Sequence, residues 1–206
     1  EQLVAWLASR EQKPDVLLSG SAVGWYGDAG ERELDERQPP VSSDYASQLC
    51  AAWEDAALLA EPLGIRVVRI RTGLVLAADG GFLKRLLLPF KLALGGPIGN
   101  GRQWMPWIHL HDQVALMDFL LHHEAACGPY NACAPAPVRS RAFAKALGAA
   151  LHRPAFMPLP AIFLKLGLGE LSALLLGGQR ALPKRLLEAG FVFRFNTLET
   201  ALADLL

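Results

Sequence analysis

A serine in a short segment of small residues offers the first candidate chemistry. Ser21 lies in the stretch Ser19–Gly27, directly after the apolar run Val16-Leu17-Leu18. Such a run, ending in small residues, is typical of a buried strand of a parallel sheet. In open α/β sheets, ligands bind beyond the carboxyl ends of the strands, where a hydroxyl can donate to or accept from a substrate oxygen. A turn serine bonded to its own backbone gives the same pattern, so spacing alone leaves both interpretations open.

The glycines of this segment match a spacing used by dinucleotide-binding loops. Gly24, Gly27 and Gly30 stand three residues apart. A phosphate-binding loop must turn directly into a helix, whose free N–H groups meet the anion. Here the turn is followed instead by carboxylates, at Glu31, Glu33, Asp35 and Glu36. Because these would repel a pyrophosphate, we expect no cofactor phosphate at these glycines, and no other segment offers a phosphate loop.

The composition is that of a globular chain. The sequence has 206 residues, of which 52% are hydrophobic and 19% are charged, and its formal net charge is zero. A disordered chain would be less apolar, and a general nucleic-acid-binding surface would be more basic. We therefore expect no nucleic-acid partner.

Cysteine usage and hydropathy bear on metals, redox state and membranes. The cysteines (Cys50, Cys127 and Cys133) are odd in number and widely spaced, which favours reduced thiols in a cytoplasmic protein over disulfides or zinc. His109, His111 and Asp112 lack a distant partner ligand, so we expect no metal and take Asp112 as the cap of the next helix. The apolar stretch 159–178 contains Lys165 and Glu170, which predicts a buried or interfacial helix and no membrane span.

Helix and strand patterns alternate around the serine. Residues 1–11 have amphipathic helix spacing from their very start, so we expect an N-terminal part of the protein to be missing. A second helix follows the cap candidates Ser42, Ser43 and Asp44, and one face of it would carry Tyr45, Leu49, Trp53 and Ala57. Residues 65–71 are the next strand, closed by Thr72-Gly73. This order is a βαβ unit, whose crossover is right-handed.

The remaining pattern completes an α/β architecture. Residues 80–94 and 112–122 have helical patterns, and 130–133 form a short strand. Asn100-Gly101 favours a tight hairpin near residues 95–107, before an extended aromatic stretch. We expect residues 1–136 to form the C-terminal part of a doubly wound parallel sheet, and residues 137–206 to form a small, mostly helical domain on the substrate side.

Motifs along nearly the whole chain resemble one family. The segment Ser19–Gly27 is similar to the active-site strand end of extended short-chain dehydrogenases and nucleotide-sugar epimerases. Further blocks resemble the epimerase-like subfamily that ends in a helical domain of unknown function, namely Arg71–Leu76, Leu88–Phe90, Leu94–Gly99, Pro106–His109 and Gly178–Leu186. The resemblance implies a Rossmann-like domain that binds NAD or NADP. It also implies hydride exchange with a sugar nucleotide or a small carbonyl substrate.

The resemblance also implies a catalytic set. The family uses a strand-end serine, which Ser21 matches, and a tyrosine four residues before a lysine. Tyr45 lies at the expected distance, yet the fourth residue after it is Leu49. A tyrosine, with an ordinary pKa of about 10, needs a nearby cation to act as a base near neutrality. We therefore expect Tyr45 to donate a hydrogen bond at most, and its apolar row favours a core position over a catalytic one.

Cofactor contacts are implied at two strand ends, through Ser19 and Gly20 at the first and through Gly73, Leu74 and Val75 at the second. Gly73 would permit close approach of the cofactor. The loop from Gly95 to Trp107 could cover a ligand or pack on its own domain. Because the lysine is missing, the alternative function is a non-catalytic NADP(H)-binding sensor or partner-binding module. A homodimer is a further expectation.

Overall fold

A parallel sheet forms the centre of the molecule. The computed structural model describes residues 1–41, 44–158 and 177–206. Strands β1 (Val16–Ala22), β3 (Arg66–Thr72) and β7 (Gly128–Ala132) pair in parallel in the order β1-β3-β7. The register places Ser21 beside Arg71, and Arg71 beside Asn131. These polar residues therefore stand in one row across the carboxyl end of the sheet.

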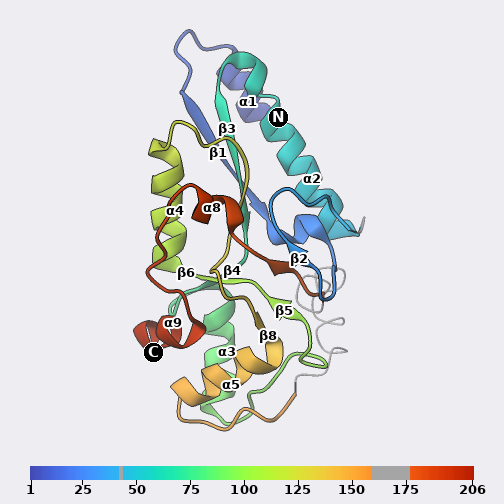
Figure 1. Ribbon diagram of the computed structural model, residues 1–206, viewed down its shortest axis with the longest axis vertical. Helices are drawn as coiled ribbons and strands as arrows, with labels where there is room; N and C mark the ends of the chain where they lie inside the picture. Colours follow the sequence, from blue (N-terminus) through green and yellow to red (C-terminus); the bar gives the residue numbers. More distant parts are fainter. Residues whose placement is uncertain (42–43, 159–176) are drawn as a thin grey trace.

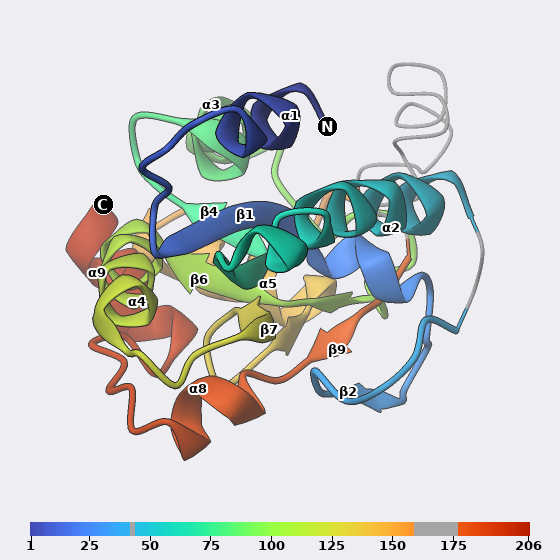
Figure 2. The same cartoon turned by 90° about the horizontal axis from the view of Figure 1, so that it is seen from above.

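Helices cover both faces of this sheet (Figure 2). On one face, α1 (Gln2–Ala8) and α2 (Tyr45–Leu58) pack in a cluster that includes Val67 of β3. On the other face, α4 (Leu110–His122) and α8 (Lys184–Glu188) pack in a cluster with Val68 and Ile70. The two faces alternate along β3 because successive side chains of a strand point to opposite sides. The α/β class expected from the sequence is confirmed.

A second layer of short elements extends from the sheet (Figure 1). β4 (Leu74–Leu76) pairs in parallel with β6 (Trp107–His109). α3 (Gly81–Lys91), α5 (Ser140–Ala150) and α9 (Leu198–Leu205) surround Trp107, which is fully buried. This core draws residues from both sides of the boundary expected at residue 136. The remaining short elements are η1 (Val23–Tyr26), β2 (Glu33–Leu34), η2 (Glu61–Leu63) and β9 (Arg180–Ala181), of which β2 and β9 pair in parallel.

The hairpin expected near residues 95–107 is wrong. β5 (Trp104–Met105) pairs in antiparallel fashion with β8 (Val138–Arg139), which lies far along the chain. Gly99 and Gly101 do adopt positive φ values of 56° and 73°, so the turn chemistry is present. The turn leads the chain to β5, which pairs with a strand far along the sequence. Local turn propensity does not determine which strand β5 pairs with.

The apolar row expected on α2 is also wrong. The face of α2 that packs on the sheet carries Ala46, Cys50, Glu54 and Ala57. Tyr45 is 53% exposed and Trp53 is 49% exposed, so the large side chains lie outside. The helix turns a carboxylate inward because Glu54 meets two arginines of β3 there. Asp44 does cap this helix, accepting a hydrogen bond from the Ser47 N–H at 2.9 Å.

The cap of α4 is His109, which corrects the assignment to Asp112. The Nδ1 atom of His109 accepts a hydrogen bond from the His111 N–H at 2.9 Å. Asp112 is buried and instead accepts hydrogen bonds from the backbone N–H groups of Arg194 and Phe195, both at 3.0 Å. It thereby joins α4 to the C-terminal segment.

The apolar stretch 159–178 lies almost entirely outside the described residues, so its expected helix stays a prediction. Within the described ranges, no helix is both long enough and apolar enough to cross a membrane. Cys50, Cys127 and Cys133 carry free thiols.

Candidate active site

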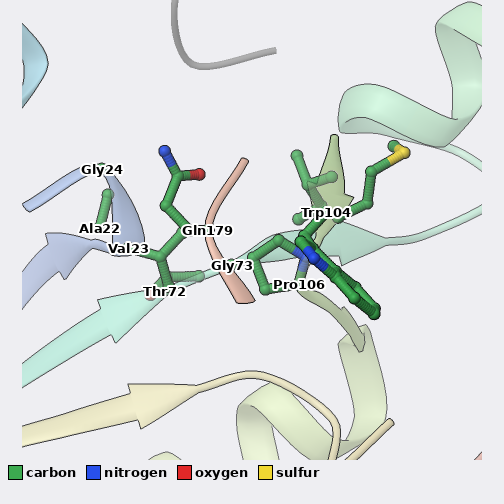
Figure 3. Close-up of a pocket in the computed structure, with 10 residues that line it drawn as sticks. Ala22, Val23, Gly24, Thr72, Gly73, Trp104, Pro106 and Gln179 are labelled. Atoms are coloured by element: carbon green, nitrogen blue, oxygen red, sulfur yellow. The ribbon is translucent and has the colours of Figure 1, made fainter. Parts of the chain in front are cut away.

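A cavity of about 150 Å³ opens where β1 and β3 end (Figure 3). Its lining comes from four separate segments of the chain, two of which are the strand ends. The strand ends contribute Ala22, Val23, Gly24, Thr72, Gly73 and Leu74, and the other two parts contribute Trp104, Met105, Pro106 and Gln179. Because ligands of open α/β sheets bind beyond the carboxyl ends of the strands, this cavity is the candidate active site.

Gly73 shapes one wall of the cavity. A Cβ atom at this residue would collide with the carbonyl oxygen of Pro106. Its N–H donates to Ala132 at 3.0 Å, and the N–H of Leu74 donates to Pro106 at 2.7 Å. The glycine is therefore required for the close approach of two backbones. Gly73 and Leu74 both line the cavity.

The other expected cofactor residues lie elsewhere. Ser19 and Gly20 line a separate, open groove at the outer edge of β1, together with Trp53. Val75 lies in β4, paired with Ile108. The structure thus brings Gly73 and Leu74 to the cavity and keeps Ser19 and Gly20 apart from them, and the cofactor contacts stay predictions.

Ser21 lies directly behind the cavity wall formed by Ala22. Its side chain is 7% exposed, and its hydroxyl donates a hydrogen bond to Glu54 Oε1 at 2.9 Å. β1 continues through Ala22, so Ser21 is a strand residue and its side chain points toward α2. To contact a ligand in the cavity, the serine would have to change rotamer and release Glu54.

A buried ion-pair cluster holds Ser21 in place, and the sequence interpretation missed it. Glu54 is 2% exposed and accepts two hydrogen bonds from Arg71, at 2.7 and 2.9 Å. Arg69 adds a third at 3.0 Å. The guanidinium carbon of Arg71 also lies 3.4 Å from the ring centroid of Trp25, a cation–π contact. One feature of the sequence could have indicated this cluster. The strand over residues 66–72 carries arginines among apolar residues, and an arginine in a buried strand needs an acidic partner.

Tyr45 is not positioned as a core residue, and its catalytic role stays a prediction. It begins α2 with its side chain half exposed. The buried tyrosine of this region is Tyr26, whose hydroxyl lies 3.0 Å from the Asp35 carbonyl oxygen and 2.8 Å from Asn131 Oδ1. Burial raises the pKa of Tyr26 to about 12. Tyr26 is therefore a structural hydrogen-bond donor and a poor base.

The glycine spacing does not form a phosphate loop. Gly24 lies in η1, and Gly27 and Gly30 have positive φ values of 73° and 57°. The chain then runs into β2, so no α-helix N-terminus follows these glycines. Of a nicotinamide dinucleotide, the flat ring end fits the apolar walls formed by Leu74, Met105 and Pro106. The Cβ position of Gly73 is filled by the Pro106 carbonyl, so the lack of a side chain there makes room for protein backbone and not for a cofactor. The glycine turn does not fit the phosphates.

The cavity is bounded on its far side by an aromatic residue held between charges. Trp104 has the guanidinium carbons of Arg139 and Arg180 at 4.7 and 4.8 Å from its ring centroid. Its Nε1–H donates to Glu31 Oε2 at 3.2 Å. The hydrogen bond from Arg139 lowers the pKa of Glu31, and the bond from Trp104 acts in the same direction. Among the described residues, no group of three or more His, Cys, Asp or Glu side chains is arranged to hold a metal ion.

Comparison with known proteins places this architecture in a family. Residues 2–133 match the model of the NAD dependent epimerase/dehydratase family. Residues 159–205 match a domain of unknown function, DUF1731. The Rossmann-like sheet, with a cavity at its strand ends, is the architecture of proteins that bind a nicotinamide dinucleotide. The chain belongs to the NAD-dependent epimerase/dehydratase family.

Similar proteins are longer than this chain, which spans about two thirds of the length of the first two given below. The chain is 38% identical over 200 residues to the epimerase family protein YfhF of Bacillus subtilis, covering 97% of this chain and 66% of that protein. The human epimerase family protein SDR39U1, solved with NADPH, superposes with a TM-score of 0.92 at 34% identity, covering 98% of this chain and 69% of that one. A nucleoside-diphosphate sugar epimerase from Corynebacterium glutamicum gives a TM-score of 0.75 at 31% identity, covering 99% and 40%.

Proposed function

We propose that the protein is an NAD(P)-dependent oxidoreductase of the epimerase/dehydratase type that acts on a small carbonyl compound or a sugar nucleotide. The observation that carries the proposal is the cavity at the ends of β1 and β3, with Gly73 and Leu74 in its wall. The human relative solved with NADPH supports NADP as the cofactor. The free thiols support a cytoplasmic location.

In this proposal, Gly73 and Leu74 would hold the nicotinamide ring, which supplies the hydride chemistry when bound. Ser21 would turn from Glu54 to the cavity and polarise the substrate oxygen through a hydrogen bond from its hydroxyl, and Tyr45 would donate a second hydrogen bond. Glu54 would keep the two arginines paired meanwhile. The apolar lining, including Met105 and Pro106, would exclude water from the reacting atoms.

The test uses the whole gene product, because the chain spans 66% of the length of its Bacillus relative. Binding is followed by nicotinamide fluorescence during titration with NADPH, and turnover by NADPH oxidation on a panel of aldehydes, ketones and nucleotide sugars. Ser21→Ala is expected to lower kcat at least about 100-fold, the usual contribution of a hydrogen-bond donor to a developing oxyanion. Tyr45→Phe is the companion variant. Turnover unchanged by both substitutions would show that the assigned roles are wrong.

A second function, NADP(H) sensing or partner binding without catalysis, is favoured by two specific features. The Ser21 proton is already bound by Glu54, and Leu49 occupies the position of the family's lysine. A sensor would bind NADPH without oxidising it on any member of the panel. Turnover by the wild-type protein that Ser21→Ala abolishes would exclude this second function.

A further inference from the structure

Gln179 presents an unoccupied hydrogen-bond acceptor at the cavity. Its side chain is 4% exposed and lies between the strand ends and Trp104 (Figure 3). The Nε2 atom donates to the Gly27 carbonyl oxygen at 3.2 Å, which fixes the orientation of the amide. Among the described residues, no donor bonds to the amide oxygen. The amide oxygen of a buried glutamine normally accepts a hydrogen bond. Because no protein donor reaches this oxygen, we expect a ligand to supply the donor.

The backbone around Gln179 is held rigidly. The N–H of Gly178 donates to Asp28 Oδ1 at 3.1 Å, and the Gly178 carbonyl accepts from the Ala29 N–H at 3.1 Å. A Cβ atom at Gly178 would lie 3.0 Å from the backbone nitrogen of Trp104, so this position is tightly packed. Gln179 therefore reaches the cavity from a fixed base.

The residues that follow are anchored to the sheet. Ala181 accepts a hydrogen bond from the Cys133 thiol at 3.3 Å, and Leu182 accepts one from Asn131 Nδ2 at 3.0 Å. Lys184 Nζ lies 2.9 Å from Asp35 Oδ2. The C-terminal segment is thus joined to the loop after β1 at several points, and Gln179 is its contribution to the cavity.

The rest of the cavity lining is largely apolar. Val23, Leu74, Met105 and Pro106 surround a space of about 150 Å³. A space of this size holds a group of a few heavy atoms. Of the other polar side chains in the lining, Thr72 donates its hydroxyl to the Ile70 carbonyl at 3.4 Å and Trp104 donates to Glu31 at 3.2 Å, so the Gln179 oxygen is the side-chain acceptor left for a donor on that group. A hydroxymethyl group next to a carbonyl has this shape and polarity. An ethyl group of similar size would leave the Gln179 oxygen without a partner.

We propose that Gln179 is a specificity-determining residue whose amide oxygen accepts a hydrogen bond from a substrate hydroxyl beside the reacting carbonyl. The proposal rests on the proposed function. It selects α-hydroxycarbonyl compounds as the substrate class. It also assigns a role to part of the matched domain of unknown function, residues 159–205, which would supply a substrate-binding side chain.

The test compares hydroxyacetone with butanone, a matched pair in which a hydroxyl replaces a methyl group. Dissociation constants are measured by ligand-detected NMR on the whole gene product with saturating NADPH. The wild-type protein is expected to bind hydroxyacetone about tenfold more tightly than butanone, and Gln179→Met is expected to reduce this preference to about twofold or less.

Two further variants separate recognition from folding. Lys184→Met removes an exposed anchor of the same segment but leaves the cavity oxygen, so it is expected to keep the preference. Gln179→Glu loses the donor to Gly27 but keeps an acceptor oxygen at the cavity, so this variant is also expected to keep the preference for hydroxyacetone. Thermal melting verifies that each variant is folded.

The possible outcomes distinguish this proposal from the proposed function. A wild-type protein that binds both probes alike, or binds neither, overturns the role of Gln179. So does an unchanged preference in Gln179→Met, or a change confined to NADPH affinity. If the preference follows the variants as expected while NADPH is never oxidised, the role of Gln179 stands and the oxidoreductase function is wrong.

Discussion

The hydroxyl of Ser21 donates a hydrogen bond to Glu54 Oε1 at 2.9 Å, which links two residues that are 33 positions apart in the sequence. Glu54 is held in turn by Arg71 through a two-point ion pair, with both side chains 2% exposed. The serine that sequence similarity marks as catalytic is therefore part of a buried polar cluster. A role of Ser21 at the cavity would require its hydroxyl to leave this carboxylate.

Glu54→Ala is expected to lower the free energy of unfolding by about 3–5 kcal/mol, because it leaves the guanidinium of Arg71 buried without its counter-ion. Urea unfolding of the whole gene product measures this change. Asp55→Ala is the matched control, since Asp55 is the exposed neighbour on the same helix. Removing both charges, with Glu54→Leu and Arg71→Met together, is expected to restore much of the loss. A loss below about 1 kcal/mol in Glu54→Ala would contradict the importance of this ion pair.

Gly73→Ala is expected to destabilise the protein by about 1–3 kcal/mol, because the new Cβ would collide with the Pro106 carbonyl and force the two backbones apart. The cavity should change shape with it, so NADPH affinity is expected to fall as well. Gly20→Ala is the control, since a Cβ there meets nothing within 4 Å. Equal unfolding midpoints for the two variants would show that the contact at Gly73 is not tight.

The protein is expected to lose stability as the pH falls below about 6.5. Burial holds the pKa of His109 below its ordinary value, against the opposing effect of Asp204 and Asp112. The unfolded chain therefore takes up a proton at a higher pH than the folded chain does. This contribution is complete above pH 6.5 and is lost as the pH falls toward the folded-state pKa.

Unfolding midpoints in urea, measured from pH 8 to pH 5, test the role of His109. His109→Asn keeps an oxygen that can cap α4 but does not titrate, so its pH dependence is expected to be weaker. His122→Gln removes a histidine whose side chain is 73% exposed and should leave the dependence unchanged. An undiminished pH dependence in His109→Asn would assign the effect to another group.

Asn131→Ala is expected to cost about 3 kcal/mol, because it removes the donor to the Leu182 carbonyl, one of two donors to the Leu34 carbonyl and an acceptor of the Tyr26 hydroxyl. The Asn131 Nδ2 atom donates to the carbonyl oxygens of Leu34 and Leu182, at 3.3 and 3.0 Å. Tyr26→Phe removes only the hydroxyl and should cost about 1 kcal/mol, since the Asp35 carbonyl keeps the Gln38 N–H and Asn131 Oδ1 alone loses its donor. A cost for Asn131→Ala no larger than that for Tyr26→Phe would mean that water replaces the lost donors.

Local sequence patterns located the elements because each pattern reflects a short-range cause. The strand after Asp15, the cap at Asp44 and the strand expected over residues 65–71 are confirmed, with β1 extending to Ala22 and β3 spanning Arg66–Thr72. The family was also evident from motifs spread along the chain. These features depend on hydrogen bonding and hydrophobic periodicity within a few residues.

Only the tertiary structure decided which faces are buried and which residues share the site. In the folded protein Glu54 points inward and Tyr45 points outward. Leaving the arginines of β3 buried without a counter-ion would cost more free energy than leaving an apolar side chain exposed, so the helix buries its carboxylate. The tertiary structure paired Trp104–Met105 with a strand that lies more than 30 residues away, and it placed Gln179 opposite Thr72 in one cavity. Such pairings depend on where distant segments meet in space, and spacing along the chain does not specify that.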